Sequence, residues 1–377
     1  MDVNISQKSL WLKHFEEMPD PRIDRRKQHL LMDILVMTLC AVICGATSWE
    51  SIEDYGHKQE SWLKTFLELP NGIPSHDTIA RVFSLMDAKK FSLCFMGWMK
   101  EVVGRLKGVV AIDGKRLRAA SLGREPIHLV NAFAAANGVS LGQYQVKDKS
   151  NEITAIPDLL KLLSLEGCIV TIDAMGCQKE IAANIIEAKA DYVLGLKGNQ
   201  GRLLENVKLY LDTLYQGGLK EVTREHKETV DKEHGRFEKR YYLITDRIDW
   251  LEEKADWTGL NSIGMVISER MVKDVTTVER RYYLSSLPAK ADIFSHVVQH
   301  WSVENQLHWV LDVTFNEDRQ RMNTKYAAQN LAVIRQSALN LLRMDQSSKK
   351  MSMKRKQFCA ALDHKYLQSL IMQCDKL

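Results

Sequence analysis

The sequence predicts an α/β protein in which an all-helical amino-terminal domain precedes a mixed sheet. From Ser9 to about Leu106, apolar residues recur three and four positions apart, as on helix faces. From Val109 to Leu196 the residue pattern changes to runs of strand length that are rich in β-branched residues. Two helical stretches separate these runs, in the order β-β-β-α-β-α-β. An antiparallel three-strand unit joined to parallel strands with packed helices is the order of an RNase H-like core.

The helical region, residues 1–106, contains one segment with two open interpretations. Asn71–Thr78 is a turn leading into a helix that Ser75 or Asp77 could cap. It is either a capped packing helix or the second helix of a helix-turn-helix, which would enter the major groove from about His76 with Arg81 near phosphate.

Five strands are expected between Val109 and Leu196, and two of them form a hairpin. The expected strands are Val109–Gly114, Ile127–Ala136, Val139–Val146, Cys168–Asp173 and Tyr192–Leu196, with helices over 155–165 and 178–189. Asn137-Gly138 predicts a type I′ turn between the second and third strands, because both residue types tolerate positive φ.

A β-rich insertion is expected at residues 201–290. A helix to about Leu214 precedes three strand-like stretches, at Arg240–Thr245, Ile263–Arg270 and Arg280–Ser285. Helical periodicity returns over 293–310 and 327–344, so the predicted RNase H-like core comprises residues 107–200 and 291–345. Residues 346–377 form a basic tail with a last amphipathic stretch, and its lysines are expected to be surface charge.

Composition narrows the class of protein without identifying a function. The 377 residues, 45% hydrophobic with net charge +4, fit a globular protein of two or three domains, and this charge favours a polyanion partner only weakly. The seven cysteines are scattered without a CxxC pair, which predicts reduced thiols and no structural zinc. The amino terminus lacks a signal-peptide pattern, and the apolar run Ile34–Ala46 is too short to span a bilayer, so we expect a cytoplasmic protein without membrane contact.

Three acids are candidate metal ligands. Asp113 and Asp173 each follow a continuously apolar strand, and adjacent strand tips can share a divalent cation. Either acid alone would more simply start a turn. The third ligand should come from a helix beyond the sheet, where Glu304 has Trp301, Leu307 and other apolar residues at helical spacing.

These residue types suit phosphodiester chemistry. Two metal ions about 3.5–4 Å apart can activate a nucleophile and stabilise the leaving oxygen. Mg²⁺ prefers oxygen ligands and retains exchangeable waters, so we expect Mg²⁺, with Mn²⁺ as a substitute. Among the helix acids, Glu304 is preferred over Asp312, Glu317 and Asp318, which lie nearer the helix end or in a polar stretch.

Several motifs together resemble the H-repeat-associated transposases of bacterial insertion sequences. The resemblance covers nearly the whole chain, including Pro19–Arg22 and Gly72–Thr78 in the helical region. In the core it rests on Asp113-Gly-Lys115, Lys149–Ile153, Asp173-Ala-Met175, Ala190–Gln200 and His300–Val313.

The resemblance implies a DDE transposase with an RNase H-like fold, a catalytic triad of Asp113, Asp173 and Glu304, and a β-strand insertion before the Glu. It also implies double-stranded DNA as partner, both element ends and target, and two protomers paired on the DNA. Related insertion-sequence transposases carry a Tyr and an Arg seven and four residues before the Glu and a Lys seven after it. This chain has Val297, His300 and Leu311 there.

The missing Arg and Lys direct attention to other residues that could contact DNA. We consider His300, which occupies the position of the Arg, together with Lys115 and Arg116 beside Asp113. Lys197 and Asn199 lie near the active edge of the sheet and could contact substrate, although a turn at the strand end explains them equally well.

Two other functions stay open. One is an RNase H-like DNA nuclease without strand transfer, and the other is a domesticated DNA-binding protein without catalysis. An actin-like phosphotransferase is remote, because no glycine-rich phosphate loop of the expected kind follows the first strand.

Overall fold

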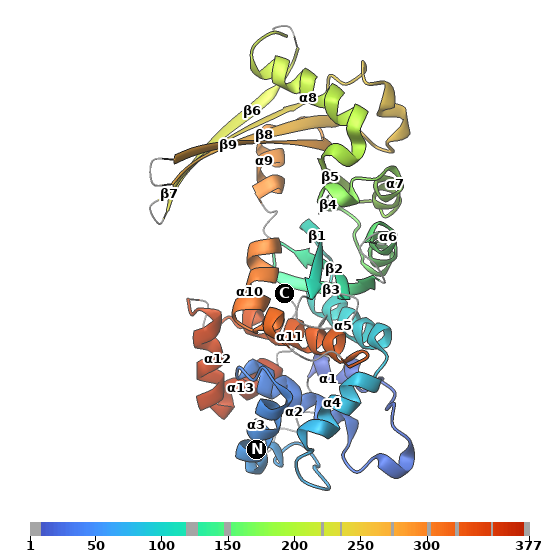
Figure 1. Cartoon of the computed structure of the whole chain (residues 1–377), viewed down its shortest axis with the longest axis vertical. Coiled ribbons are helices and arrows are strands. Elements are labelled where there is room, and N and C mark those ends of the chain that lie inside the picture. Colours follow the sequence, from blue (N-terminus) through green and yellow to red (C-terminus); the bar gives the residue numbers. More distant parts are fainter. Residues whose placement is uncertain are drawn as a thin grey trace.

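The computed structural model describes residues 9–117, 127–146, 152–219, 222–233, 236–272, 275–299, 303–320, 324–347 and 350–372. The molecule is elongated (Figure 1). Helices from both ends of the chain gather at one end, the first strands lie in the middle, and long hairpins extend at the other end.

The amino-terminal region is helical as predicted. Its helices are α1 (Leu10–Phe15), α2 (Leu31–Ile43), α3 (Trp49–Leu63), α4 (His76–Leu85) and α5 (Ala88–Val103). Ser75 caps α4 by accepting a hydrogen bond from the Thr78 amide. Almost every residue of α2 is buried, which accounts for its apolar sequence. None of the described helices is long and apolar enough to cross a membrane.

The central strands form the predicted RNase H-like sheet. They are β1 (Gly108–Leu117), β2 (Ile127–Ala134), β3 (Val139–Val146), β4 (Cys168–Ile172) and β5 (Asp191–Leu196), in the spatial order β3-β2-β1-β4-β5. β1, β2 and β3 pair antiparallel, whereas β4 pairs parallel with both β1 and β5. The helices α6 (Glu152–Leu162) and α7 (Lys179–Glu187) connect these strands. The fold is therefore α/β with an RNase H-like core.

The β2–β3 hairpin forms, but its turn is not the predicted type I′. Only Gly138 has a positive φ, 68°, and its amide donates to the carbonyl of Ala134. Type I′ needs positive φ at both central residues, and Asn137 is not among the described residues with positive φ. The longer turn from Ala135 to Gly138 relieves Asn137 of that conformation.

The insertion extends the core sheet. After α8 (Gly201–Tyr215) come β6 (Glu225–Glu233), β7 (Arg236–Thr245), β8 (Ser262–Val272) and β9 (Val275–Ser285). β9 pairs antiparallel with β5, which gives one nine-stranded sheet ending β5-β9-β8-β7-β6. β6 was not predicted. Figure 1 shows α8 and α9 (Ala291–Gln299) on opposite faces of these hairpins.

The carboxyl-terminal helices join the core to the helical domain. Beyond α9 come a π-helical turn at Glu304–His308, α10 (Trp309–Val313), α11 (Ala327–Met344), α12 (Met353–Leu362) and α13 (His364–Ile371). α11 is buried along nearly its whole length and packs against α2, α4, α5 and β3. Within it, Asn330 donates to the carbonyls of Phe83 and Met86.

One basic residue of the tail is not the surface charge we expected. Lys356 of α12 is 3% exposed, and its Nζ donates to the carbonyl of Leu342 at 2.6 Å. The same Nζ lies 3.3 Å from the carboxylate of Asp345. Because burial of an unpaired ammonium is costly, these oxygens explain why a lysine occupies this position.

Candidate active site

The register of two parallel strands brings Asp113 and Asp173 to the same edge of the sheet. Ile112 of β1 pairs with Ile172 of β4, and each Asp is the next residue. The residues from Val109 to Ile112 are buried, as the sequence predicts. β1 does not end at Asp113, however, because it continues to Leu117 in antiparallel pairing with β2.

The Asp113 carboxylate is approached by a buried histidine. Nδ1 of His308 lies 3.5 Å from Oδ2 of Asp113, while the amide of Gly114 donates to Oδ1 at 2.9 Å. Nε2 of His308 faces the Asn131 side-chain amide at 3.5 Å. Burial lowers the pKa of His308 to about 4, with a further lowering contribution from Lys115, so the imidazole is neutral at pH 7. A neutral ring with its proton on Nδ1 matches an acceptor at Asp113 and a donor at Asn131.

Asp173 is held by the turn that it begins. Its Oδ1 accepts from the backbone amides of Met175 at 3.1 Å and Gly176 at 3.4 Å, which caps the short 3₁₀ helix Ala174–Gly176. In the same turn, the carbonyl of Ala174 accepts from the side chain of Asn199 at 2.6 Å. Together these contacts limit where the carboxylate can point.

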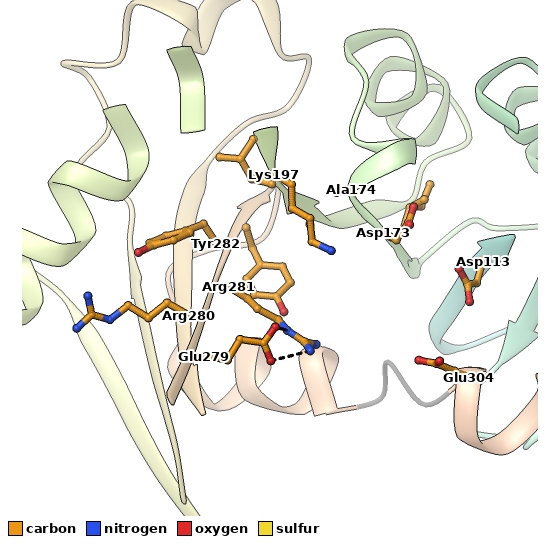
Figure 2. A pocket seen from close by; sticks show the side chains of 13 residues that line it. Asp113, Asp173, Ala174, Lys197, Glu279, Arg280, Arg281, Tyr282 and Glu304 are labelled. Carbon is orange, nitrogen blue, oxygen red and sulfur yellow. Dashed lines mark hydrogen bonds and ion pairs between the residues drawn. The ribbon is translucent and has the colours of Figure 1, made fainter. Parts of the chain in front are cut away.

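Glu304 begins the π-helical turn Glu304–His308 and has an exposed side chain. π-helical turns are rare and often mark functional sites. One pocket of about 380 Å³ is lined by all three acids, Asp113, Asp173 and Glu304. Lys197, the residue after β5, and residues Glu279 to Tyr283 of β9 also line it. Figure 2 shows the three acids on three separate elements along one side of this pocket.

The donor set fits a hard divalent cation, because carboxylate oxygens are the ligands that Mg²⁺ and Mn²⁺ prefer. The three carboxylates share a pocket without converging. Among the described residues, no three His, Cys, Asp or Glu side chains are close enough to hold one ion. Ligation would therefore require the acids to move together, and Glu304, exposed at a π-helical turn, is the least constrained of them.

Lys115, which we expected near phosphate, has other partners. Its side chain is buried, and Nζ donates at 2.6 Å both to Asp312 Oδ1 and to Glu317 Oε2. Burial alone would lower the pKa of Lys115, but Glu317 and Asp312 outweigh it and leave the pKa above its usual value. A phosphate contact would require breaking both ion pairs.

The other residues expected to contact DNA are dispersed. Lys197 lines the pocket. Arg116, the residue after Lys115 on β1, is exposed. Arg81 is exposed on α4, in the helical domain at the opposite end of the molecule from the hairpins (Figure 1). His300 lies outside the described residues. The loop between α3 and α4, residues 64–75, is longer than the three- or four-residue turn of a helix-turn-helix.

Sequence reasoning missed a second cavity beside the pocket. It has a volume of about 480 Å³ and lies on the face of the insertion hairpins that carries α9. Arg240, Arg270 and Arg281 project into it from three neighbouring strands, and Arg281 and Glu304 also line the first pocket. Glu238 and Glu279 pair with Arg240 and Arg281 at 2.7 and 2.8 Å. The available signal was that each of the three predicted strands contains one of these arginines. That the three arginines share one face is apparent only once the strands are paired.

Known protein families match both the amino-terminal helical region and the rest of the chain up to residue 341. The family model DDE_Tnp_1-associated matches residues 12–99, and the model "Transposase DDE domain" matches residues 104–341. The "Putative transposase YncI" of Escherichia coli O157:H7 is 41% identical over 379 residues, covering 97% of this chain and 95% of that protein. The "H repeat-associated putative transposase YhhI" of Escherichia coli K12 is 40% identical over 370 residues, covering 96% and 97%.

A solved structure also matches along most of the chain. It is the piggyBac transposase synaptic complex with hairpin DNA, with a TM-score of 0.46 and 12% identity, covering 98% of this chain and 78% of that one. One family model spans more than half of the chain, and two relatives are 40% and 41% identical to it over nearly their whole length. The chain therefore belongs to the family of transposases with a DDE domain.

Proposed function

We propose that this protein cleaves the ends of an insertion-sequence element and joins them to target DNA, using Asp113, Asp173 and Glu304 as the ligands of Mg²⁺ or Mn²⁺. The observation that carries the proposal is that these acids, from β1, the end of β4 and the π-helical turn, line one open pocket. A bound metal pair would activate the attacking oxygen and neutralise charge on the phosphate. The protein's part is to hold the carboxylates and align the DNA.

The proposed reaction has two steps at the same site. Water first attacks a phosphorus atom at the element end, the bond to the 3′ oxygen breaks, and a 3′-hydroxyl is released. That hydroxyl then attacks a phosphorus atom of the target strand and displaces a second 3′ oxygen. Lys197 lines the pocket and can balance the negative charge of a phosphate beside the acids.

We propose that double-stranded DNA reaches the pocket along the arginine-lined cavity. Arg240, Arg270 and Arg281 offer guanidinium groups next to Glu304, and guanidinium groups bind phosphate oxygens in pairs. The glutamates beside them would be released from their ion pairs as phosphate enters. We further propose that two protomers pair on two DNA ends in the cytoplasm, a pairing that the resemblance to H-repeat-associated transposases implies.

The test uses labelled duplexes that carry the DNA sequences flanking the gene, in one set intact and in another already cut to a 3′-hydroxyl. A transposase cuts the first set and joins the second to plasmid DNA when Mg²⁺ is added. Cutting without joining would indicate a nuclease instead. Retention of both duplexes without cutting, equal to that of the Glu304→Gln variant, would indicate a DNA-binding protein without catalysis.

A further inference from the structure

Lys115 connects the two structural elements that carry two of the proposed metal ligands. On β1 it is two residues beyond Asp113, so both side chains lie on the same face of the strand. On the facing segment its partners are Asp312 of α10 and Glu317 of the 3₁₀ helix that follows. The same segment begins with Glu304. A buried lysine thus connects the strand that carries Asp113 to the helical segment that carries Glu304.

Two side-chain pairs connect β1 to this segment. Asp113 lies 3.5 Å from His308, and Lys115 lies 2.6 Å from Asp312. The two pairs are two residues apart on the strand and four residues apart on the helical segment. Glu304 lies a further four residues before His308. If the helical segment shifted along β1 by one turn, both pairs would break and Glu304 would move by about 5.4 Å along the helix axis.

The charges around Lys115 are balanced within the protein. The side chain of Glu317 is 1% exposed and that of Lys115 is 6% exposed, whereas Asp312 is 27% exposed. Arg335 of α11 is also buried, and Glu317 and Asp312 raise its pKa against the lowering effect of burial, which is larger. Both ion pairs of Lys115 are therefore made within the protein, at a side chain that is largely shielded from solvent.

We propose that Lys115 is a positioning residue that holds the segment bearing Glu304 in register with the strand bearing Asp113, so that the two carboxylates can ligate the same metal pair. The inference rests on the proposed function, because it presupposes that these acids bind metal. It differs from a role in stability alone, since the π-helical turn between Glu304 and His308 is the part of the segment that a lost anchor would release.

The principal measurement is binding of Mn²⁺ by the full chain without DNA, followed by calorimetry. Lys115→Met is expected to weaken Mn²⁺ affinity about 10- to 100-fold, the usual effect of losing a group that orients a ligand. The matched control is Lys356→Met, which removes another buried lysine with a carboxylate partner but lies on α12. It is expected to lower the melting temperature while leaving Mn²⁺ affinity unchanged.

The second measurement needs no metal. Amide hydrogen exchange over residues 303–313 is expected to accelerate at least tenfold in Lys115→Met and to stay unchanged in Lys356→Met. If Lys115→Met does not fold, Asp312→Asn serves instead, because it removes one of the two ion pairs at a partly exposed site and should give a smaller change in the same direction.

The outcomes separate this inference from the proposed function. If wild type binds Mn²⁺ and Asp113→Asn does not, the metal site stands, and an unchanged affinity in Lys115→Met overturns the positioning role alone. If wild type binds no Mn²⁺, the proposed metal site fails. Unchanged exchange over residues 303–313 in Lys115→Met would overturn the anchor whatever the metal result.

Discussion

The side-chain amide of Asn199 donates a hydrogen bond to the backbone carbonyl of Ala174, 2.6 Å away. Asn199 lies just after β5, and Ala174 just after β4 and directly after Asp173. The bond therefore ties together the ends of two parallel strands at the edge where the proposed catalytic acids lie. It also gives Asn199 a role that requires no contact with DNA.

Asn199→Ala should reduce catalysis more than DNA binding. Loss of the bond leaves the Ala174 carbonyl with only the backbone amide of Cys177, 3.3 Å away, and is expected to cost about 0.5–1.5 kcal/mol of unfolding free energy. The turn that holds Asp173 becomes looser, so the cleavage rate at saturating DNA should fall while the Kd for DNA stays constant. A weaker Kd with an unchanged melting temperature would show instead that Asn199 contacts the substrate directly.

Divalent cations should stabilise the wild-type protein. Metal binds the folded site in preference to the unfolded chain, and at a concentration 100 times Kd this adds about 2.7 kcal/mol. Melting curves with Mg²⁺, Mn²⁺ and Ca²⁺ should therefore shift upward for wild type and much less for Asp113→Asn/Asp173→Asn, with Ca²⁺ stabilising without supporting cleavage. Equal shifts in both proteins would place the cation elsewhere.

The elements that sequence predicted best are those with local signals. Buried apolar runs that are followed by an acid identified β1 and β4, and the parallel register then accounts for the shared pocket of Asp113 and Asp173. β6 has no such signal, because Glu225–Glu233 is polar apart from an exposed valine and is a strand only through its pairing with β7. Its position at the sheet edge, away from the core, allows that composition.

Contacts between distant segments explain most of what sequence could not predict at the site. Lys115 beside an acid suggested a phosphate contact, but its partner Glu317 is 202 residues away in sequence. The residues of β9 enter the pocket because β9 pairs with β5, again across a long insertion. The predicted continuous helix over 293–310 likewise does not account for the π-helical turn at Glu304.

Arg81 and Arg22 should behave differently when changed to alanine, although both are arginines of the helical region. Arg22 is paired with Asp20 at 2.7 Å and its side chain is only 5% exposed, so Arg22→Ala should lower stability. Arg81 is exposed, so Arg81→Ala should leave the melting temperature unchanged.

The expected DNA effect of Arg81→Ala is weaker binding and a salt dependence smaller by about one phosphate contact. Both quantities come from titrations of the full chain at several salt concentrations, with Arg22→Ala measured alongside at a temperature where it is folded. If Arg81→Ala binds as wild type does at every salt concentration, α4 is a packing helix rather than a DNA-binding one.

The first turn of α4 should contribute a pH-dependent increment of stability. The carboxylate of Glu53 accepts a hydrogen bond from His76 at 2.5 Å, and this bond is the main cause that raises the pKa of His76. Because the folded pKa lies above the unfolded value near 6.5, the increment is fully present below about pH 6.5 and is lost as pH rises through the folded pKa. Melting temperatures of wild type and Glu53→Gln should therefore converge toward high pH, and a constant difference from pH 5.5 to 8.5 would contradict the ion pair.

The helix acids Glu304 and Asp312 provide the sharpest test of the proposed triad. Glu304 lines the pocket shared with Asp113 and Asp173, whereas Asp312 is engaged 2.6 Å from Lys115. Glu304→Gln keeps the size of the side chain but removes the charge that a metal ligand requires. It should abolish DNA cleavage while folding and DNA binding persist, because the exposed side chain has little part in packing.

Asp312→Asn should retain measurable cleavage, because Lys115 keeps its second partner, Glu317, and the triad itself is intact. The two variants are compared by cleavage of a labelled element end in Mg²⁺, with melting temperature and DNA affinity measured on the same preparations. A cleavage-competent Glu304→Gln protein beside a folded but inactive Asp312→Asn protein would move the third ligand to α10. In that event Lys115 would neutralise the charge of a metal ligand. Removal of Lys115 should then raise the affinity of Asp312 for the cation rather than lower it.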